Sequence, residues 1–225
     1  MHTGKGRVVE MILDNGFHHA RLTCAENLIP SPGQYLLASD DSRVPLPVPI
    51  FYADSAPKGF IAAAPIPDSW SPGREICLRG PLGQGFELPS SARRVGLVTL
   101  TDSAARLYGL IQPALKQDAA IALVSDLRID NLPDEVEVHP LSALSEIIEW
   151  ADYIALDVAR ENLPGLREQI FNGGQAKAPI KAQVLVRSPV PCGGIAECGV
   201  CAVTVKSGWK MACKEGPVFD WKELW

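Results

Sequence analysis

The sequence predicts an α/β plus β protein with three parts in chain order, namely an antiparallel β-barrel at 1–90, a doubly wound parallel α/β lobe at 91–180 and a small hairpin domain at 181–225. Three observations support this. The first part consists of short apolar runs between Pro- and Gly-rich turns, which is typical of barrel strands. In the second part, buried strands alternate with helices, which indicates a parallel sheet. The third part gathers four of the six cysteines in a Gly-rich stretch too short for its own core.

Six runs predict the barrel strands. Each is short, rich in aliphatic or aromatic residues, and bounded by Gly, Pro, Asn, Asp or Ser. Strands of this length at such close spacing pair as antiparallel neighbours. The runs are GRVVEMILD, HHARLTCAE, GQYLLAS, PVPIFYA, GFIAAAP and REICLRG.

The lobe alternates strands and helices. The expected helices are DSAARLYGLIQPALKQ, capped by Asp102 or Ser103 and bent or shortened at Pro113, then LSALSEIIEWA, then NLPGLREQIFNGG, which ends at Gly173. A sheet with helices between its strands has parallel order. The expected strands are RVGLVTLT, AAIALVSD, VEVHP, DYIALDVA and finally KAQVLVRSP, which leads into the cysteines.

Composition and charge narrow the function classes. The chain has 225 residues, 47% of them hydrophobic, and a formal net charge of −5. No basic stripe is present, so neither nucleic acid nor an anionic membrane is an expected partner. The N-terminus MHTGKGRVVEM lacks the apolar segment of a signal peptide, and no apolar run could span a bilayer. We therefore expect a cytoplasmic protein with reduced thiols.

The clustered cysteines have the spacing C-x5-C-x2-C-x11-C. Alternating residues after Cys201 and a turn near Ser207 predict a hairpin that sets Cys213 opposite Cys201. Glycines in the preceding loop let backbone N–H groups approach thiolate or sulfide closely. Three apolar side chains are expected to shield the site from water: Ile195, Val200 and Val203.

Four interpretations of this cluster remain open. A 2Fe-2S cluster needs four thiolates, three close together and one distal, as here. A structural zinc site more often uses two C-x2-C pairs, and only one is present. The third interpretation is a pair of disulfides, which would suit a secreted protein. The fourth is that the cysteines bind no metal and serve only in packing. The spacing favours the iron–sulfur cluster, with Cys192, Cys198, Cys201 and Cys213 as ligands. The isolated Cys24 and Cys77 are expected to be small buried hydrophobic residues.

The stretch CGGIAECGVCAV…CKEGPVF resembles the C-terminal signature of the electron-transfer subunit of heteromeric dihydroorotate dehydrogenases. These belong to the ferredoxin-reductase-like flavoproteins that end in a 2Fe-2S domain. The stretches SPGQYLL and GREICLRGPLGQGFELP also agree with that family. The resemblance implies a flavin-binding barrel, a nucleotide-binding lobe and a cluster domain. It also implies electron flow from NADH through FAD and the cluster to FMN in a separate catalytic subunit of pyrimidine biosynthesis.

The flavin motif departs from the family. Its Arg-Pro-x-Ser stretch corresponds here to PLPVPIFYA, with Val48 in place of the Arg and Phe51 in place of the Ser. A second motif, a Gly-x-Thr turn, should fall within IAAAPIPDSW, which has no glycine. FAD binding is therefore open, and residual binding would use the barrel and the GPLGQGF loop. By resemblance, its contacts would be Pro49, Ile50, Phe51, Gly80, Pro81, Gly83 and Gly85.

The nicotinamide motif departs further. After the first lobe strand the family has a Gly-rich turn, whose backbone amides meet the pyrophosphate at a helix N-terminus. Here that strand is followed by TDSAARLY, and Asp102 puts a carboxylate where a phosphate would sit. We expect NAD(H) binding to be weak or absent.

The leading hypothesis is an iron–sulfur electron-transfer subunit that has no catalytic residues of its own and relays electrons to or from a partner oxidoreductase. By resemblance the partner is an FMN-containing dihydroorotate dehydrogenase subunit in a hetero-oligomer. The first alternative is a structural or regulatory subunit with decayed nucleotide sites and a metal site that holds the tail folded. The second is an intact FAD-dependent NADH reductase. Phe219, Trp221 and Trp225 either anchor the partner or fold back onto the lobe.

Overall fold

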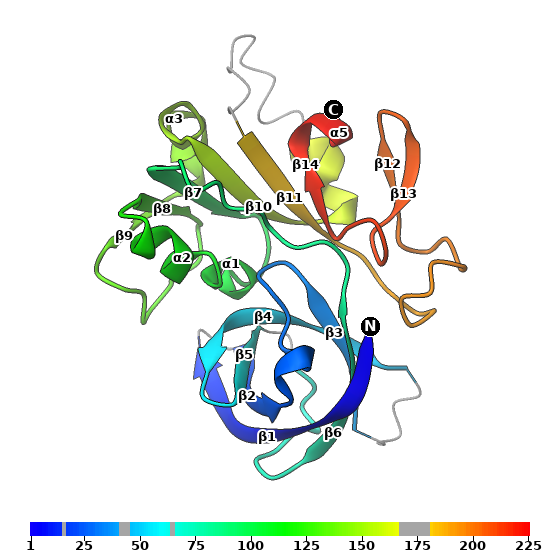
Figure 1. Ribbon diagram of the computed structural model, residues 1–225. Coiled ribbons are helices and arrows are strands. Elements are labelled where there is room, and N and C mark those ends of the chain that lie inside the picture. The colour runs from blue at the N-terminus through cyan, green and yellow to red at the C-terminus, as the bar shows by residue number, and fades with distance from the viewer. Residues whose placement is uncertain (15–16, 41–45, 64–65, 167–180) are drawn as a thin grey trace.

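The computed structural model describes residues 1–14, 17–40, 46–63, 66–166 and 181–225, and it places a β-barrel against an α/β lobe (Figure 1). Six antiparallel strands close the barrel in the order β1-β2-β5-β4-β3-β6, which confirms the predicted N-terminal architecture. A short 3₁₀ helix, η1 (Glu26–Leu28), follows β2. The strands are β1 (His2–Asp14), β2 (Phe17–Cys24), β3 (Tyr35–Ser39), β4 (Val48–Ala56), β5 (Gly59–Ala63) and β6 (Glu75–Leu82).

The two faces of the barrel wall have different roles. Leu36 and Ala38 of β3 point into the barrel core, where they join Ile76 and Leu78 of β6. Because side chains alternate along a strand, their neighbours face outward. Tyr35, Leu37 and Leu82 form a separate cluster with Phe51 on that outer face. The barrel thus presents an apolar outer surface to the rest of the chain.

The lobe is a six-stranded sheet in the order β14-β11-β10-β7-β8-β9, parallel except for β14. The stretch KAQVLVRSP, predicted as the last strand of this sheet, is β11, and it pairs with β10 along its length. The short strand β14 then adds to the sheet beside β11. The strands are β7 (Arg94–Thr99), β8 (Ala120–Val124), β9 (Val136–His139), β10 (Tyr153–Ala159), β11 (Lys181–Arg187) and β14 (Val218–Asp220).

Helices cover both faces of the sheet, as a doubly wound fold requires. The short helices α1 (Ala105–Tyr108) and α2 (Ile111–Lys116) pack on one face, and α3 (Leu144–Trp150), preceded by the 3₁₀ helix η2 (Leu141–Ala143), packs on the other. The expected single helix is broken at Gly109, where an added Cβ would lie 2.7 Å from the Tyr52 ring of the barrel. Pro113 lies in the first turn of α2, where proline is tolerated.

The last predicted helix lies partly outside the described residues. The 3₁₀ helix η3 (Arg160–Asn162) leads into a helical turn at 163–166, and the predicted end at Gly173 is not described. No helix within the described ranges combines the length and the apolar character needed to cross a membrane.

The C-terminal segment adds a hairpin, β12 (Ala202–Val205) and β13 (Gly208–Met211), and a closing helix, α5 (Trp221–Leu224). Its buried residues share one core with the α3 face of the lobe. Phe219 and Trp221 are 2% and 4% exposed in that core, and the Trp225 ring meets the Trp221 ring edge-on at 4.3 Å. The aromatic tail therefore folds back onto the lobe.

Candidate iron–sulfur centre

The Gly-rich loop at 190–200 runs from the end of β11 to the hairpin and carries Cys192 and Cys198. Its backbone turns through left-handed conformations, with φ of +67° at Gly193, +78° at Gly194 and +69° at Gly199. Such values are strained for most side chains, which accounts for the glycines. As a result, the N–H groups of Gly194, Ile195 and Ala196 all donate to the Cys192 sulfur.

The four predicted ligands lie in two pairs. The side chain of Cys192 is hydrogen-bonded to that of Cys198, and the side chain of Cys213 is hydrogen-bonded to that of Cys201. The hairpin makes the second contact as predicted, although Cys201 lies across from Ala212, whose N–H donates to the Cys201 carbonyl at 3.0 Å. Cys201 and Cys213 are buried, Cys192 is half-buried and Cys198 is exposed.

The surroundings of the two pairs shift the pKa of Cys213 and the pKa of Cys192 in opposite directions. Burial raises the pKa of Cys213 to about 12, and the adjacent thiols of Cys201 and Cys192 act in the same direction. At Cys192 burial also acts upward, but the Cys198 side chain and the three loop N–H groups outweigh it and lower the pKa to about 6. The loop therefore stabilises a thiolate at Cys192, whereas burial keeps the Cys213 thiol protonated until a metal displaces the proton.

The arrangement of the four thiols in two pairs indicates which kind of metal site they suit. Within the described residues, no group of three or more His, Cys, Asp or Glu side chains could hold a metal ion. A structural zinc ion needs four ligands converging on one point. A 2Fe-2S cluster divides its four thiolates between two irons, so two pairs of thiols match its donor set.

The outer face of the barrel forms the floor of the site. The Tyr35 hydroxyl donates a buried hydrogen bond of 3.0 Å to the Cys213 carbonyl. Burial raises the pKa of Tyr35, and so do the thiols of Cys213, Cys201 and Cys192, while Arg79 acts in the opposite direction. An added Cβ on Gly194 would lie 3.3 Å from both the Tyr35 oxygen and Leu82. The loop thus rests directly on the barrel.

The lobe holds the other side of the loop. Arg160 donates to the carbonyl oxygens of Val200 and Ala202. Val203 is buried as predicted, but Ile195 and Val200 are 53% and 40% exposed, so the prediction that they shield the site from water is wrong. The reason is that the loop curves onto the barrel through its glycines, which leaves these two side chains outside.

The predicted flavin strand lies on this same outer face. The Phe51 ring packs against Tyr35 with the ring centroids 5.7 Å apart. The cavity lined by Pro49, Phe51 and Tyr35 on the barrel side, with Val186 and Pro217 opposite, has a volume of only about 10 Å³. That is about enough for one water molecule. Ile50 is fully buried inside the barrel. As packed, these residues do not fit an isoalloxazine ring.

The glycines of the GPLGQGF loop serve packing between segments. Gly80 precedes Pro81 through a cis peptide bond, and an added Cβ there would lie 2.6 Å from Leu36. At Gly83 it would lie 2.5 Å from the Gly216 carbonyl oxygen, and at Gly85 it would lie 2.7 Å from the Pro32 carbonyl oxygen. Each glycine is explained by close contact with protein backbone or side chain, so none of them needs a phosphate to account for it.

The turn after β7 is filled by an ion cluster. Arg106, 1% exposed, donates from Nε to the Asp157 carboxylate at 2.6 Å, and Asp157 is 0% exposed. Arg106 Nη2 also donates to the Thr101 hydroxyl and the Ser103 carbonyl. Arg187 approaches Asp157 at 3.3 Å. The guanidinium groups near the expected pyrophosphate position are thus already paired with carboxylates of the chain.

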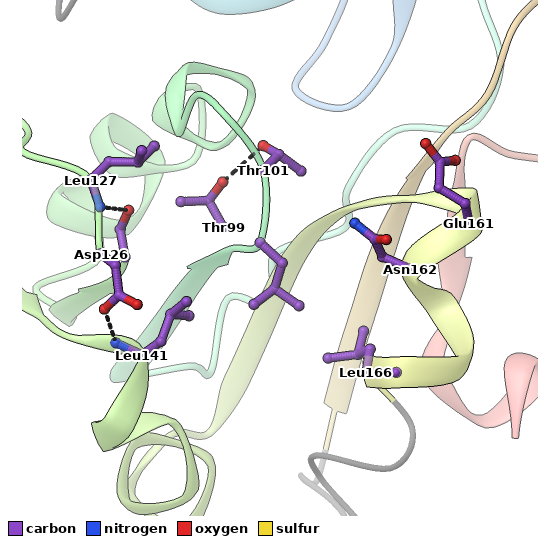
Figure 2. A pocket seen from close by; sticks show the side chains of 11 residues that line it. Thr99, Thr101, Asp126, Leu127, Leu141, Glu161, Asn162 and Leu166 are labelled. Carbon is purple, nitrogen blue, oxygen red and sulfur yellow. Dashed lines mark hydrogen bonds between the residues drawn. The ribbon is translucent and has the colours of Figure 1, made fainter.

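A larger cavity of about 540 Å³ opens at the carboxyl ends of β7 and β8, and Figure 2 shows its lining. Asp126 accepts from the Leu141 N–H at 2.8 Å, and Glu161 stands on the opposite wall. Among the described residues, no Lys or Arg lines the cavity. Ligands of open α/β sheets bind at such positions, but two carboxylates without a cation disfavour a dinucleotide.

Sequence reasoning missed Tyr35, Arg79, Arg106 and Asp157. Tyr35 and Arg79 lie within the two stretches that carried the family resemblance in the barrel, SPGQYLL and GREICLRGPLGQGFELP, which was the available signal. Nothing in the sequence linked Arg106 to Asp157, which lies on β10, 51 residues away. Of the isolated cysteines, Cys77 is exposed and Cys24 half-buried. Cys77 faces outward because it alternates with Ile76 and Leu78, so the prediction of a buried residue is wrong there.

Comparison with known proteins agrees with this geometry. Residues 192–225 match the family described as the iron–sulfur cluster binding domain of dihydroorotate dehydrogenase B. No curated protein matches the chain in sequence. The matched segment contains all four clustered cysteines.

Solved structures are similar over most of the chain. An NADH-dependent reduced ferredoxin-NADP oxidoreductase, studied for flavin-based electron bifurcation, has a TM-score of 0.74 at 17% identity and covers 97% of this chain and 88% of its own. The ferredoxin reductase of carbazole 1,9a-dioxygenase has a TM-score of 0.58 at 16% identity, covering 77% and 64%. A variant ferredoxin-NADP+ reductase from Plasmodium falciparum in complex with 2'P-AMP has a TM-score of 0.60 at 11% identity, covering 81% and 95%.

These identities are low, so the structures establish the ferredoxin-reductase-like fold, while the family match establishes the C-terminal domain. The chain therefore has a ferredoxin-reductase-like fold, and its residues 192–225 resemble the iron–sulfur cluster binding domain of dihydroorotate dehydrogenase B.

Proposed function

We propose that the chain relays single electrons through a 2Fe-2S cluster held by Cys192, Cys198, Cys201 and Cys213. The observation that carries the proposal is the two pairs of thiols, one of them in a loop that aims three N–H groups at the Cys192 sulfur. The cluster supplies one-electron chemistry when bound. The chain's own residues anchor it, donate hydrogen bonds to it and seat the loop on the barrel.

The partner that we propose is an FMN-containing dihydroorotate dehydrogenase catalytic subunit in a hetero-oligomer. Cys198 and the apolar side chains of Ile195 and Val200 are exposed on the loop, and Trp209 at the start of β13 is 76% exposed. Electron transfer weakens steeply with distance, so the partner's acceptor has to approach this loop. Exposed aromatic and aliphatic side chains beside it are suited to a protein interface.

FAD stays a prediction for this chain. The fold is that of flavin-dependent reductases, one of which is described in an FAD apo form. Against this, the space at Phe51 is about 10 Å³, and Val48 replaces the expected arginine. No step of the proposed relay passes through FAD or NAD(H).

The visible and EPR spectra of the purified chain, with iron, sulfide and flavin analysis, test the proposal. Iron–sulfur bands that disappear in Cys198→Ser and persist in Cys77→Ser are expected. A colourless protein containing zinc would favour the structural alternative, in which the metal holds the tail folded. Iron–sulfur and flavin bands together, with saturable NADH binding, would favour the intact reductase.

A further inference from the structure

The guanidinium of Arg79 lies directly beneath the cysteine loop. Arg79 is on β6, opposite Thr3 of β1 and Leu37 of β3. Ile76 and Leu78 belong to the barrel core, so the alternation of the strand sends Arg79 to the outer face. An added Cβ on Gly193 would lie 3.3 Å from Arg79 Nη2. The guanidinium therefore contacts the residue that follows Cys192.

Two of the donor nitrogens of Arg79 lack an acceptor. Nε and Nη2 are buried from solvent and have no hydrogen-bond partner within the described residues. Buried charged donors are normally paired, because desolvation without a partner is costly. Arg106, by contrast, satisfies its buried guanidinium with Asp157. Two unpaired, buried guanidinium nitrogens thus indicate an anionic acceptor that the described residues do not supply.

The acceptor has to lie on the side of the cysteines. Arg79 and the thiols of Cys192, Cys201 and Cys213 all act electrostatically on the same Tyr35 hydroxyl, so they surround one small region. A 2Fe-2S cluster with four thiolate ligands is an anion, and one-electron reduction makes it more negative. A fixed cation beside it stabilises the reduced form more than the oxidised form.

We infer that Arg79 tunes the iron–sulfur centre, donating charge-assisted hydrogen bonds from Nε and Nη2 to the cluster and raising its reduction potential. The inference rests on the proposed function, namely a cluster at the four cysteines. The step that it affects is the addition of one electron from a one-electron donor. No bond breaks and no proton moves, and the added negative charge is balanced by the guanidinium.

The test compares the full-length protein with Arg79→Gln, Arg79→Lys and the control Arg74→Gln, each purified with its cluster. Arg74 lies just before the same strand and is paired with Asp40 at 3.3 Å. Each protein is assayed for iron and sulfide and is then titrated with dithionite in the presence of redox dyes. Arg79→Gln should disfavour reduction by at least tenfold, a lowering of about 59 mV for a one-electron couple.

The reduction potentials of the variants should fall in a defined order. Arg79→Lys keeps the charge but loses the planar fork, so its potential should fall between those of the wild type and Arg79→Gln. Arg74→Gln should leave the potential unchanged. At about 1 M salt, where the Debye length is about 3 Å, the Arg79 effect should persist because Nε and Nη2 are buried.

A measurement on the wild type covers the case in which Arg79→Gln loses its cluster. Hyperfine spectroscopy of the reduced protein, labelled with ¹⁵N-arginine, should detect a coupled guanidinium nitrogen that is absent in Arg79→Lys. A full cluster with an unchanged potential in Arg79→Gln would overturn the inference, as would the absence of that coupling. Flavin bands that vanish in Arg79→Gln would assign Arg79 to a flavin instead. A wild type without any iron–sulfur cluster would refute the proposed function itself.

Discussion

Replacing Arg106 with Met tests whether the turn after β7 is closed by an internal ion pair. Arg106 and Asp157 are 1% and 0% exposed, and their closest atoms are 2.6 Å apart. Removing one partner of a buried pair leaves the other charge uncompensated, at a cost of about 3–5 kcal/mol. Arg187, at 3.3 Å from Asp157 and 25% exposed, compensates in part.

We therefore expect Arg106→Met to lower the free energy of unfolding by about 3 kcal/mol, the lower end of that range. For a chain of this size, the loss lowers Tm by about 6–12 °C. Thermal and urea denaturation followed by circular dichroism measure it. The double variant Arg106→Met/Asp157→Leu should recover most of the loss, because no buried charge is then left without its counterion.

Arg94→Met is a matched control. Arg94 also pairs with a carboxylate at 2.6 Å, that of Asp152, but the two side chains are 49% and 28% exposed. Exposed pairs contribute little to stability, so Arg94→Met should cost far less than Arg106→Met. If Arg106→Met were as stable as Arg94→Met, or if the double variant were the least stable of all, the idea that a buried ion pair holds this turn would be refuted.

Three further outcomes follow from the structure. Titration with NADH or NADPH should give no saturable binding at physiological concentration. Asp102→Gly should not restore binding, because Arg106 still fills the turn. Saturable binding of either nucleotide by the wild type would contradict this prediction. Trp209→Ala should weaken assembly with the catalytic subunit and leave Tm unchanged. By contrast, Trp221→Ala truncates a side chain that is only 4% exposed, so it should destabilise the chain by about 3–5 kcal/mol. Intact assembly of the Trp209→Ala variant would show that β13 is not part of the interface. Phe51→Ser should enlarge the cavity at Tyr35 without conferring tight FAD binding, since no cation is restored at Val48, and stoichiometric flavin after reconstitution would disprove that reasoning.

Local patterns predicted most of the architecture. The barrel strands and the alternating lobe could be read from turn residues and apolar runs, because each strand has its own periodicity. The break near Gly109 comes just before Pro113, where a bent or shortened helix was predicted, but the contact of Gly109 with Tyr52 of the barrel could not be read from the sequence. The strand β14 was not predicted either, because its pairing with β11 is a long-range contact.

The candidate site, too, was predictable only in part. The four cysteines were predictable from spacing and glycines, and the hairpin that joins Cys201 and Cys213 from alternation. Tyr35 and Arg79 reach the site only because the barrel wall lies beneath the loop. The burial of Phe219 and Trp221 depends on a core shared with the lobe, so composition alone left two interpretations of the tail open.

Iron and acid-labile sulfide analysis, together with the EPR spectrum of the dithionite-reduced chain, tests the central claim most directly. The account predicts equal amounts of iron and sulfide, the signal of a reduced 2Fe-2S cluster, and loss of both in each Cys→Ser variant at 192, 198, 201 and 213. A protein that binds zinc and no iron, or one whose cluster survives in Cys198→Ser but disappears in Cys24→Ser, would contradict it.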